Sequence, residues 1–261
     1  MKRQARVEIG RRVGVIMAAV GIAALALALL FGVAGFDGAD HARLTVTRAC
    51  GSVAFVGIIF YLGYRPRLAV SPRTAAAVVI PALVVAVNNL PIIPLITGEA
   101  VVTGDTLDVA LFAVECVFIG LFEETAFRGV LLLTVVERYG KTRRGLFLSA
   151  VITSAVFGAS HLFNLLGGAG VGATLLQVSY SFLIGGMCSL VLLLTGSLSA
   201  CVVIHAVYDF GGYLVPRLGE GRIWTPAEVT LTAVVGVAAL VYFLLAARRL
   251  DPEVARKLAG E

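Results

Sequence analysis

Long apolar stretches follow one another along almost the whole chain, and they restrict the possible fold more than any other feature. Most are close to the roughly 20 residues that a helix needs to cross the hydrocarbon core of a bilayer. The stretches cover residues 13–35, 46–64, 75–97, 107–136, 146–165, 173–195, 197–215 and 227–247. The sequence therefore predicts an all-α, polytopic transmembrane helical bundle with about eight spans.

The composition agrees with a multi-pass membrane protein. Hydrophobic residues make up 59% of the chain and charged residues only 14%, whereas soluble domains carry about 25% charged residues. The net charge of +5 would indicate nucleic acid in a soluble protein. Here the lysines and arginines lie in short connections between apolar stretches, and no basic stripe with interleaved aromatic residues is present. We therefore expect membrane lipids as partners and no nucleic acid.

The charges of the connections predict how the chain is oriented. Basic connections alternate with acidic or mixed ones, and they occupy residues 1–12, 65–73, 138–144 and 247–257. By the positive-inside rule this alternation places both termini in the cytoplasm. The stretch 13–35 is longer than the ~7–15-residue core of a signal peptide, so we interpret it as an uncleaved first helix. The Ala/Val/Gly/Arg-rich composition favours a bacterial plasma membrane.

We divide the chain into three parts. Residues 1–105 hold three N-terminal spans, residues 106–216 hold four spans, and residues 217–261 hold the last span and a basic tail. Prolines 81, 91 and 94 are expected to kink or break the third span. Glycines 129, 185 and 186 are expected to let helices approach closely.

The four-span part carries ionisable side chains within its apolar stretches. Each such side chain costs about 3 kcal/mol at membrane depth on insertion scales, so a chain that keeps several of them is expected to use them. Counting residues along each helix places the groups at similar depths. The groups are Glu123-Glu124-x-x-x-Arg128, Phe157-x-x-x-His161 and His205-x-x-x-Asp209.

The spacing within the first group separates its two carboxylates. Glu124 and Arg128 are four residues apart and can form an ion pair on one helix face. Glu123 lies about 100° around the helix and is left without a local partner. A carboxylate removed from water is a stronger base, which suits it to take a proton from a water molecule. The competing interpretation is that all three side chains only hold helices together.

The histidines favour a functional interpretation when they are considered together. A single histidine in a helix is more often a packing residue than a catalyst. A second one, His205, at a depth like that of His161 and with Asp209 one turn beyond it, favours function. Phe157 is expected to pack beside the site.

The remaining polar and thiol side chains give weaker indications. Glu115 is expected either to line an access path or to hydrogen-bond with Asn88 or Asn89. The four cysteines are widely spaced and show no paired-ligand spacing, so they indicate neither a disulfide framework nor a thiolate metal site. We interpret them as buried small hydrophobic residues. They are Cys50, Cys116, Cys188 and Cys201.

The three groups, in this order on successive membrane helices, resemble the signature of the CPBP family of CAAX proteases and bacteriocin-processing enzymes. This family is also called the Abi or type II CAAX prenyl endopeptidase family. The resemblance covers about residues 107–216. It implies that Glu123 and His161 activate the attacking water, that His205 and Asp209 stabilise the oxyanion, and that Glu124 and Arg128 support the site.

Asp209 departs from the family pattern, because prenyl-processing members usually carry asparagine there. An ionised aspartate would repel an oxyanion, so Asp209 is either protonated, orients His205, or helps to bind a metal. The family is often labelled a metalloprotease, although a metal-independent glutamate mechanism has also been proposed for it. A Zn²⁺ ion would be held by Glu123, His161, His205 and Asp209.

The resemblance implies an intramembrane endopeptidase that acts on a membrane-associated peptide or protein. The alternative is a proton- or cation-coupled transporter that uses the same acid and histidine cluster as a relay. Paired broken helices in two related halves would favour a transporter. Only the third span has several prolines, and the halves show no similarity, which counts against it.

Overall fold

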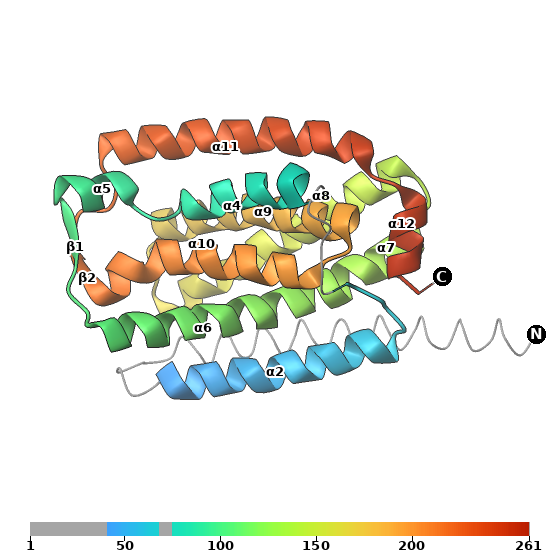
Figure 1. The fold of residues 1–261 in the computed structure, drawn as a ribbon, viewed down its shortest axis with the longest axis horizontal. Coiled ribbons are helices and arrows are strands. Elements are labelled where there is room, and N and C mark those ends of the chain that lie inside the picture. The colour runs from blue at the N-terminus through green and yellow to red at the C-terminus, as the bar shows by residue number, and fades with distance from the viewer. Residues whose placement is uncertain (1–40, 68–74, 261) are drawn as a thin grey trace, which may run out of the picture.

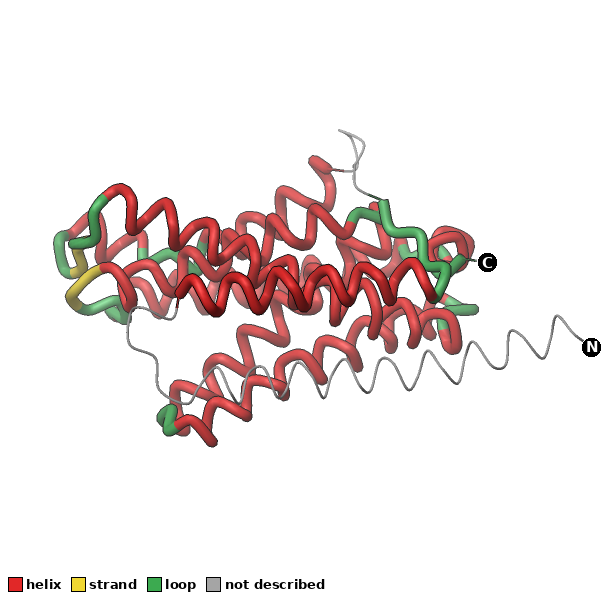
Figure 2. Tube along the Cα trace, turned by 90° about the horizontal axis from the view of Figure 1, so that it is seen from below, coloured by secondary structure: helices red, strands yellow, loops and turns green. Residues whose placement is uncertain are grey.

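The computed structural model describes residues 41–67 and 75–260, and the predicted first span at 13–35 lies outside them. The described part is mostly helical, with long helices side by side along one axis (Figures 1 and 2). Four helical segments in this part are long and apolar enough to cross a membrane. They are Arg143–Gly167, Val171–Thr195, Leu198–Leu218 and Pro226–Arg249. The all-α membrane architecture is therefore confirmed at this level.

The N-terminal part of the described chain contains one long helix and a broken span. The helices are α2 (His41–Tyr61), the π-helical η2 (Ala75–Val79), α4 (Ile80–Val87) and α5 (Ile92–Thr97). The span predicted at 75–97 is thus interrupted at residues 88–91, where Pro91 precedes the start of α5. Proline lacks the amide hydrogen that would continue the helix, which confirms the predicted break.

The middle part begins with a helix that runs without a gap from Thr106 to Tyr139 but changes its pitch. Its segments are α6 (Thr106–Glu124), the π-helical η3 (Thr125–Leu132) and α7 (Leu133–Tyr139). The next helix is α8 (Arg143–Ser160), extended by the 3₁₀ turn η4 (His161–Gly167). π-helical segments are rare and occur often at functional sites, and nothing in the residue pattern predicted this one.

The C-terminal part closes the bundle. Its helices are α9 (Val171–Thr195), α10 (Leu198–Leu218), α11 (Pro226–Ala246), the 3₁₀ turn η5 (Ala247–Arg249) and α12 (Pro252–Leu258). The turn between α9 and α10 is made by Gly196, whose positive φ of 75° suits glycine. This turn confirms the predicted division between the two helices.

Two short strands are an addition to the predicted all-α fold. β1 (Ala100–Val102) pairs antiparallel with β2 (Gly219–Gly221), and Val101 lies opposite Glu220. The strands join the loop after α5 to the end of α10, at the opposite end of the bundle from α12 (Figure 1). Three-residue strands of this kind are too short to carry a signal in the sequence.

Candidate active site

The site depends on the close packing of α6 against α10. A Cβ atom added at Gly120 would lie 2.9 Å from the carbonyl oxygen of Val202 and 3.2 Å from the amide nitrogen of Ala206. Only glycine allows the two backbones to approach this closely. Glu123 and Glu124 follow Gly120 by one turn, so the contact brings both carboxylates against the side chain of His205.

His205 lies at the centre of the buried polar cluster. Its Nδ1 is 2.6 Å from Oε1 of Glu124, and its Nε2 is 3.5 Å from both Oε2 of Glu123 and Oδ2 of Asp209. The His205 side chain is 3% exposed and that of Glu124 is fully buried, whereas that of Glu123 is 13% exposed. The structure thus brings together residues from two of the three predicted groups.

Arg128 provides the fixed positive charge. Its Nη1 lies 2.9 Å from Oε1 of Glu124, which confirms the predicted ion pair. The guanidinium carbon lies 4.4 Å from the centre of the Phe157 ring, so Arg128 also makes a cation–π contact. Phe157 and Ser154 are close enough to Gly185 that a Cβ there would be crowded, which confirms one predicted close approach.

Phe157 connects the cluster to His161. Its ring centroid is 5.2 Å from that of His161 and 5.7 Å from that of His205, both edge-on, so Phe157 packs beside the site as predicted. Nδ1 of His161 lies 3.0 Å from the Phe157 carbonyl oxygen, and Nε2 lies 3.4 Å from Oγ of Ser181. A carbonyl only accepts, so Nδ1 carries the proton, and in the neutral ring Nε2 accepts from the Ser181 hydroxyl.

A comparison with protein families identifies the family to which the segment that carries this cluster is related. Residues 105–211 match the family model "Type II CAAX prenyl endopeptidase Rce1-like", and they contain all six predicted site residues. This segment belongs to the CPBP family of CAAX proteases. No curated protein and no solved structure matches the chain. Membership in the CPBP family indicates a protease that acts in the membrane.

CPBP proteases are often labelled metalloproteases, and a metal site needs several ligand atoms close to one another. In the described part of the chain, one group of three His, Cys, Asp or Glu side chains has ligand atoms within 4.8 Å of one another, namely Glu124, Cys188 and Cys201. The ligand set predicted from the sequence forms no such group, and it therefore does not fit a metal ion here. That set is Glu123, His161, His205 and Asp209.

A chain of polar side chains that the sequence did not predict lies beside His161. Nδ2 of Asn164 donates to Oε1 of Gln177 at 2.8 Å, and Nε2 of Gln177 donates to the hydroxyl oxygen of Tyr213 at 3.0 Å. Tyr213 lies four residues after Asp209, one further step along the same helix face. This spacing was the signal that could have identified Tyr213, whereas no spacing relates Gln177 or Ser181 to the site.

No hydrogen bond joins Glu115 to Asn88 or Asn89 in the described part of the chain, so the second of the two expectations for Glu115 was wrong. Its carboxylate is 2% exposed and lies 3.1 Å from Nη1 of Arg48 and 2.8 Å from Nη1 of Arg217. Two arginines on neighbouring helices out-compete neutral amides for a buried carboxylate because charge-assisted contacts are stronger. Glu115 therefore ties α2 to α6 and α10.

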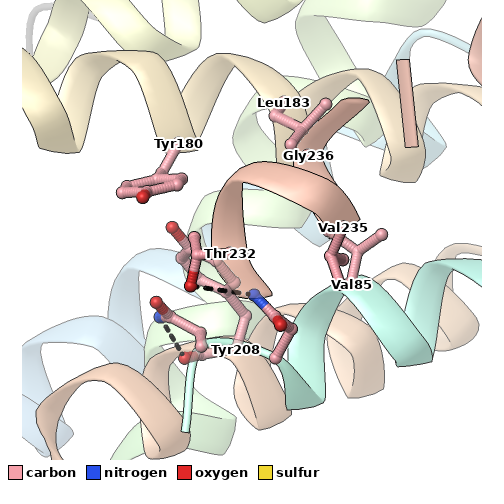
Figure 3. Close-up of a pocket in the computed structure, with 9 residues that line it drawn as sticks. Val85, Tyr180, Leu183, Tyr208, Thr232, Val235 and Gly236 are labelled. Atoms are coloured by element: carbon pink, nitrogen blue, oxygen red, sulfur yellow. Dashed lines mark hydrogen bonds between the residues drawn. The ribbon is translucent and has the colours of Figure 1, made fainter. Parts of the chain in front are cut away.

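The two asparagines instead lie at a small pocket between α4, α9, α10 and α11 (Figure 3). Nδ2 of Asn88 donates to the Thr232 hydroxyl at 3.3 Å, and Nδ2 of Asn89 donates to the carbonyl oxygen of Tyr208 at 2.8 Å. Figure 3 shows Tyr180, Tyr208 and Thr232 around this pocket. The asparagines thus fasten the broken third span to α10 and α11.

Proposed function

We propose that the protein is an intramembrane endopeptidase that hydrolyses a peptide bond of a membrane-associated peptide or protein. We also propose about eight spans, both termini in the cytoplasm, and a bacterial plasma membrane as the location. One observation carries the proposal: within a CPBP segment, a buried histidine contacts three carboxylates from two helices, α6 and α10. Such a cluster is costly to bury, and it supplies the groups that water activation needs.

Glu123 and His161 are the groups that activate water in this proposal. Glu123 has the most exposed carboxylate of the cluster around His205, whereas Glu124 is fully buried and already paired with Arg128. A water molecule next to Glu123 gives a proton to this carboxylate as its oxygen attacks the substrate carbonyl carbon. His161 offers the lone pair of Nε2 to the same water.

His205 and Asp209 then act on the tetrahedral intermediate. Nδ1 of His205 donates to Glu124, which fixes the ring and leaves Nε2 facing Glu123 and Asp209. A hydrogen on Nε2 stabilises the oxyanion, and Asp209 orients the ring through its contact with that nitrogen. As the peptide bond breaks, the proton held by Glu123 passes to the leaving amine. Glu124 and Arg128 position His205 rather than react.

The substrate class is inferred from the family description and from the proposed bacterial plasma membrane. CAAX-type cleavage is the activity that the family description prints, yet a bacterium does not ordinarily prenylate its own proteins. We therefore propose peptide maturation, bacteriocin processing or self-immunity as the use of the reaction.

The test is cleavage of a library of quenched fluorescent peptides by the purified full-length protein in detergent. Wild type, Glu123→Gln and His205→Ala are compared, each with and without a chelator. We expect the wild type to cleave, both variants to lose activity, and the chelator to have no effect. Full cleavage by Glu123→Gln contradicts the mechanism. If neither the wild type nor the two variants cleave any peptide, the result contradicts the peptidase and favours the transporter.

A further inference from the structure

Two cysteines that are 13 residues apart in the sequence lie together in the core. Cys188 on α9 and Cys201 on α10 are both 0% exposed, and their thiols point across the contact between the two helices. Sγ of Cys201 lies 3.2 Å from the carbonyl oxygen of Cys188, and Sγ of Cys188 lies 3.9 Å from that of Cys201. Both sulfur atoms lie within 4.8 Å of a carboxylate oxygen of Glu124.

Glu124 has one oxygen that the described side chains and backbone leave unused. Its Oε1 contacts Arg128 and His205, but Oε2 is fully buried and has no hydrogen-bond partner in the described part of the chain. A buried polar atom without a partner costs about 1–3 kcal/mol, and more when it is charged. This oxygen is therefore a point where a bound ligand would be stabilising.

We propose that Glu124, Cys188 and Cys201 bind one Zn²⁺ ion between α6, α9 and α10. Thiolate and carboxylate oxygen are established zinc ligands, with bonds of about 2.3 and 2.0–2.2 Å. In a tetrahedral site two sulfur ligands lie about 3.7 Å apart by these bond lengths. Ligand atoms already within 4.8 Å of one another need to move inward by only about 1 Å.

The charges of the proposed zinc site are balanced, as a buried position requires. Binding releases one proton from each of the two thiols, so two neutral thiols and a Zn²⁺ ion become a neutral zinc dithiolate and two protons in solution. The Glu124 and Arg128 charges stay paired, and the net charge of the cluster does not change. His205, which donates to the other oxygen of Glu124, orients this ligand from outside the metal shell. The ion joins three helices, and this role does not depend on the proposed proteolysis.

The first test is the zinc content of the purified full-length protein after growth with zinc and removal of loosely bound metal. Cys188→Ala and Cys201→Ala are compared with Cys116→Ala, which removes another buried cysteine, about two helical turns before Glu124 on α6 and outside the proposed ligand group. We expect about one zinc per chain in wild type and in Cys116→Ala, and at least a tenfold loss in the other two. A metal-free wild type, or equal zinc in all four proteins, overturns the proposal.

A second measurement does not require that the cysteine variants fold. X-ray absorption at the zinc edge of the wild-type protein reports the atoms bonded to the metal. Two sulfur neighbours at about 2.3 Å support the proposed ligand set. A shell made only of nitrogen and oxygen overturns it, even if zinc is present.

Discussion

The contact between α6 and α10 at Gly120 predicts what one added methyl group does to the candidate active site. In Gly120→Ala the new Cβ lies 2.9 Å from the carbonyl oxygen of Val202 and 3.2 Å from the amide nitrogen of Ala206. Comfortable carbon contacts are about 3.5 Å or longer, so the helices must separate by about 0.5 Å. Both opposing atoms belong to the backbone and cannot rotate away.

The size of the effect follows from this displacement. Overpacking costs about 1–3 kcal/mol, and the better helix propensity of alanine returns about 1 kcal/mol. We therefore expect a loss of stability of about 1 kcal/mol. The same displacement lengthens the 2.6 Å contact between His205 and Glu124. A misplacement of catalytic groups by about 1 Å can reduce a rate 100-fold. A displacement of about 0.5 Å is therefore expected to reduce the rate of peptide cleavage about tenfold.

The assay compares Gly120→Ala with Gly57→Ala in cleavage rate and in thermal stability in detergent. Gly57 also lies in a helix, α2, but a Cβ there meets no atom within 4 Å. The control is expected to keep wild-type activity. If Gly120→Ala cleaves as fast as Gly57→Ala, the close contact does not position the site and the reasoning fails.

Further predictions concern buried charge and stacking. Glu115→Gln leaves two arginines without their shared buried anion, and we expect it to lower the free energy of unfolding by about 3 kcal/mol in a mixed-micelle unfolding titration. Glu253→Gln breaks an exposed i,i+4 ion pair with Lys257 and should change the free energy of unfolding by less than about 0.5 kcal/mol. If Glu115→Gln and Glu253→Gln lower this free energy equally, the buried contacts of Glu115 with the two arginines do not stabilise the fold. Phe157→Leu removes the ring on which Arg128 stacks and should cost about 1–3 kcal/mol in the same titration, whereas an unchanged stability would show that the stacking is unimportant.

The sequence predicted the parts of the site that depend on periodicity. Four-residue spacing placed Glu124 beside Arg128 and His205 beside Asp209, and both contacts are present. Comparable depth in the membrane predicted that groups on different helices meet, and Glu124 indeed contacts His205. These features follow from helix geometry alone, so residue numbers are sufficient to derive them.

The remaining features depend on how helices pack, which spacing along one chain does not encode. His161 was expected beside the carboxylates, but no carboxylate in the described part of the chain lies within 4.0 Å of it. The 3₁₀ geometry of η4, which begins at His161, turns the ring towards the Phe157 carbonyl and Ser181. Likewise, Cys188 and Cys201 meet only because α9 and α10 fold back on each other at Gly196.

The central claim is that Glu123 is the base of a peptidase, and single-turnover cleavage by Glu123→Gln tests it most directly. The substrate is any peptide that the wild type cleaves, and the size-exclusion profile confirms that the variant is folded. Glutamine keeps the shape of the side chain but cannot take a proton from water. We predict that the variant binds the peptide but cleaves it at least 1,000-fold more slowly, a loss typical of removing such a base. A folded variant that cleaves at the wild-type rate would contradict the account.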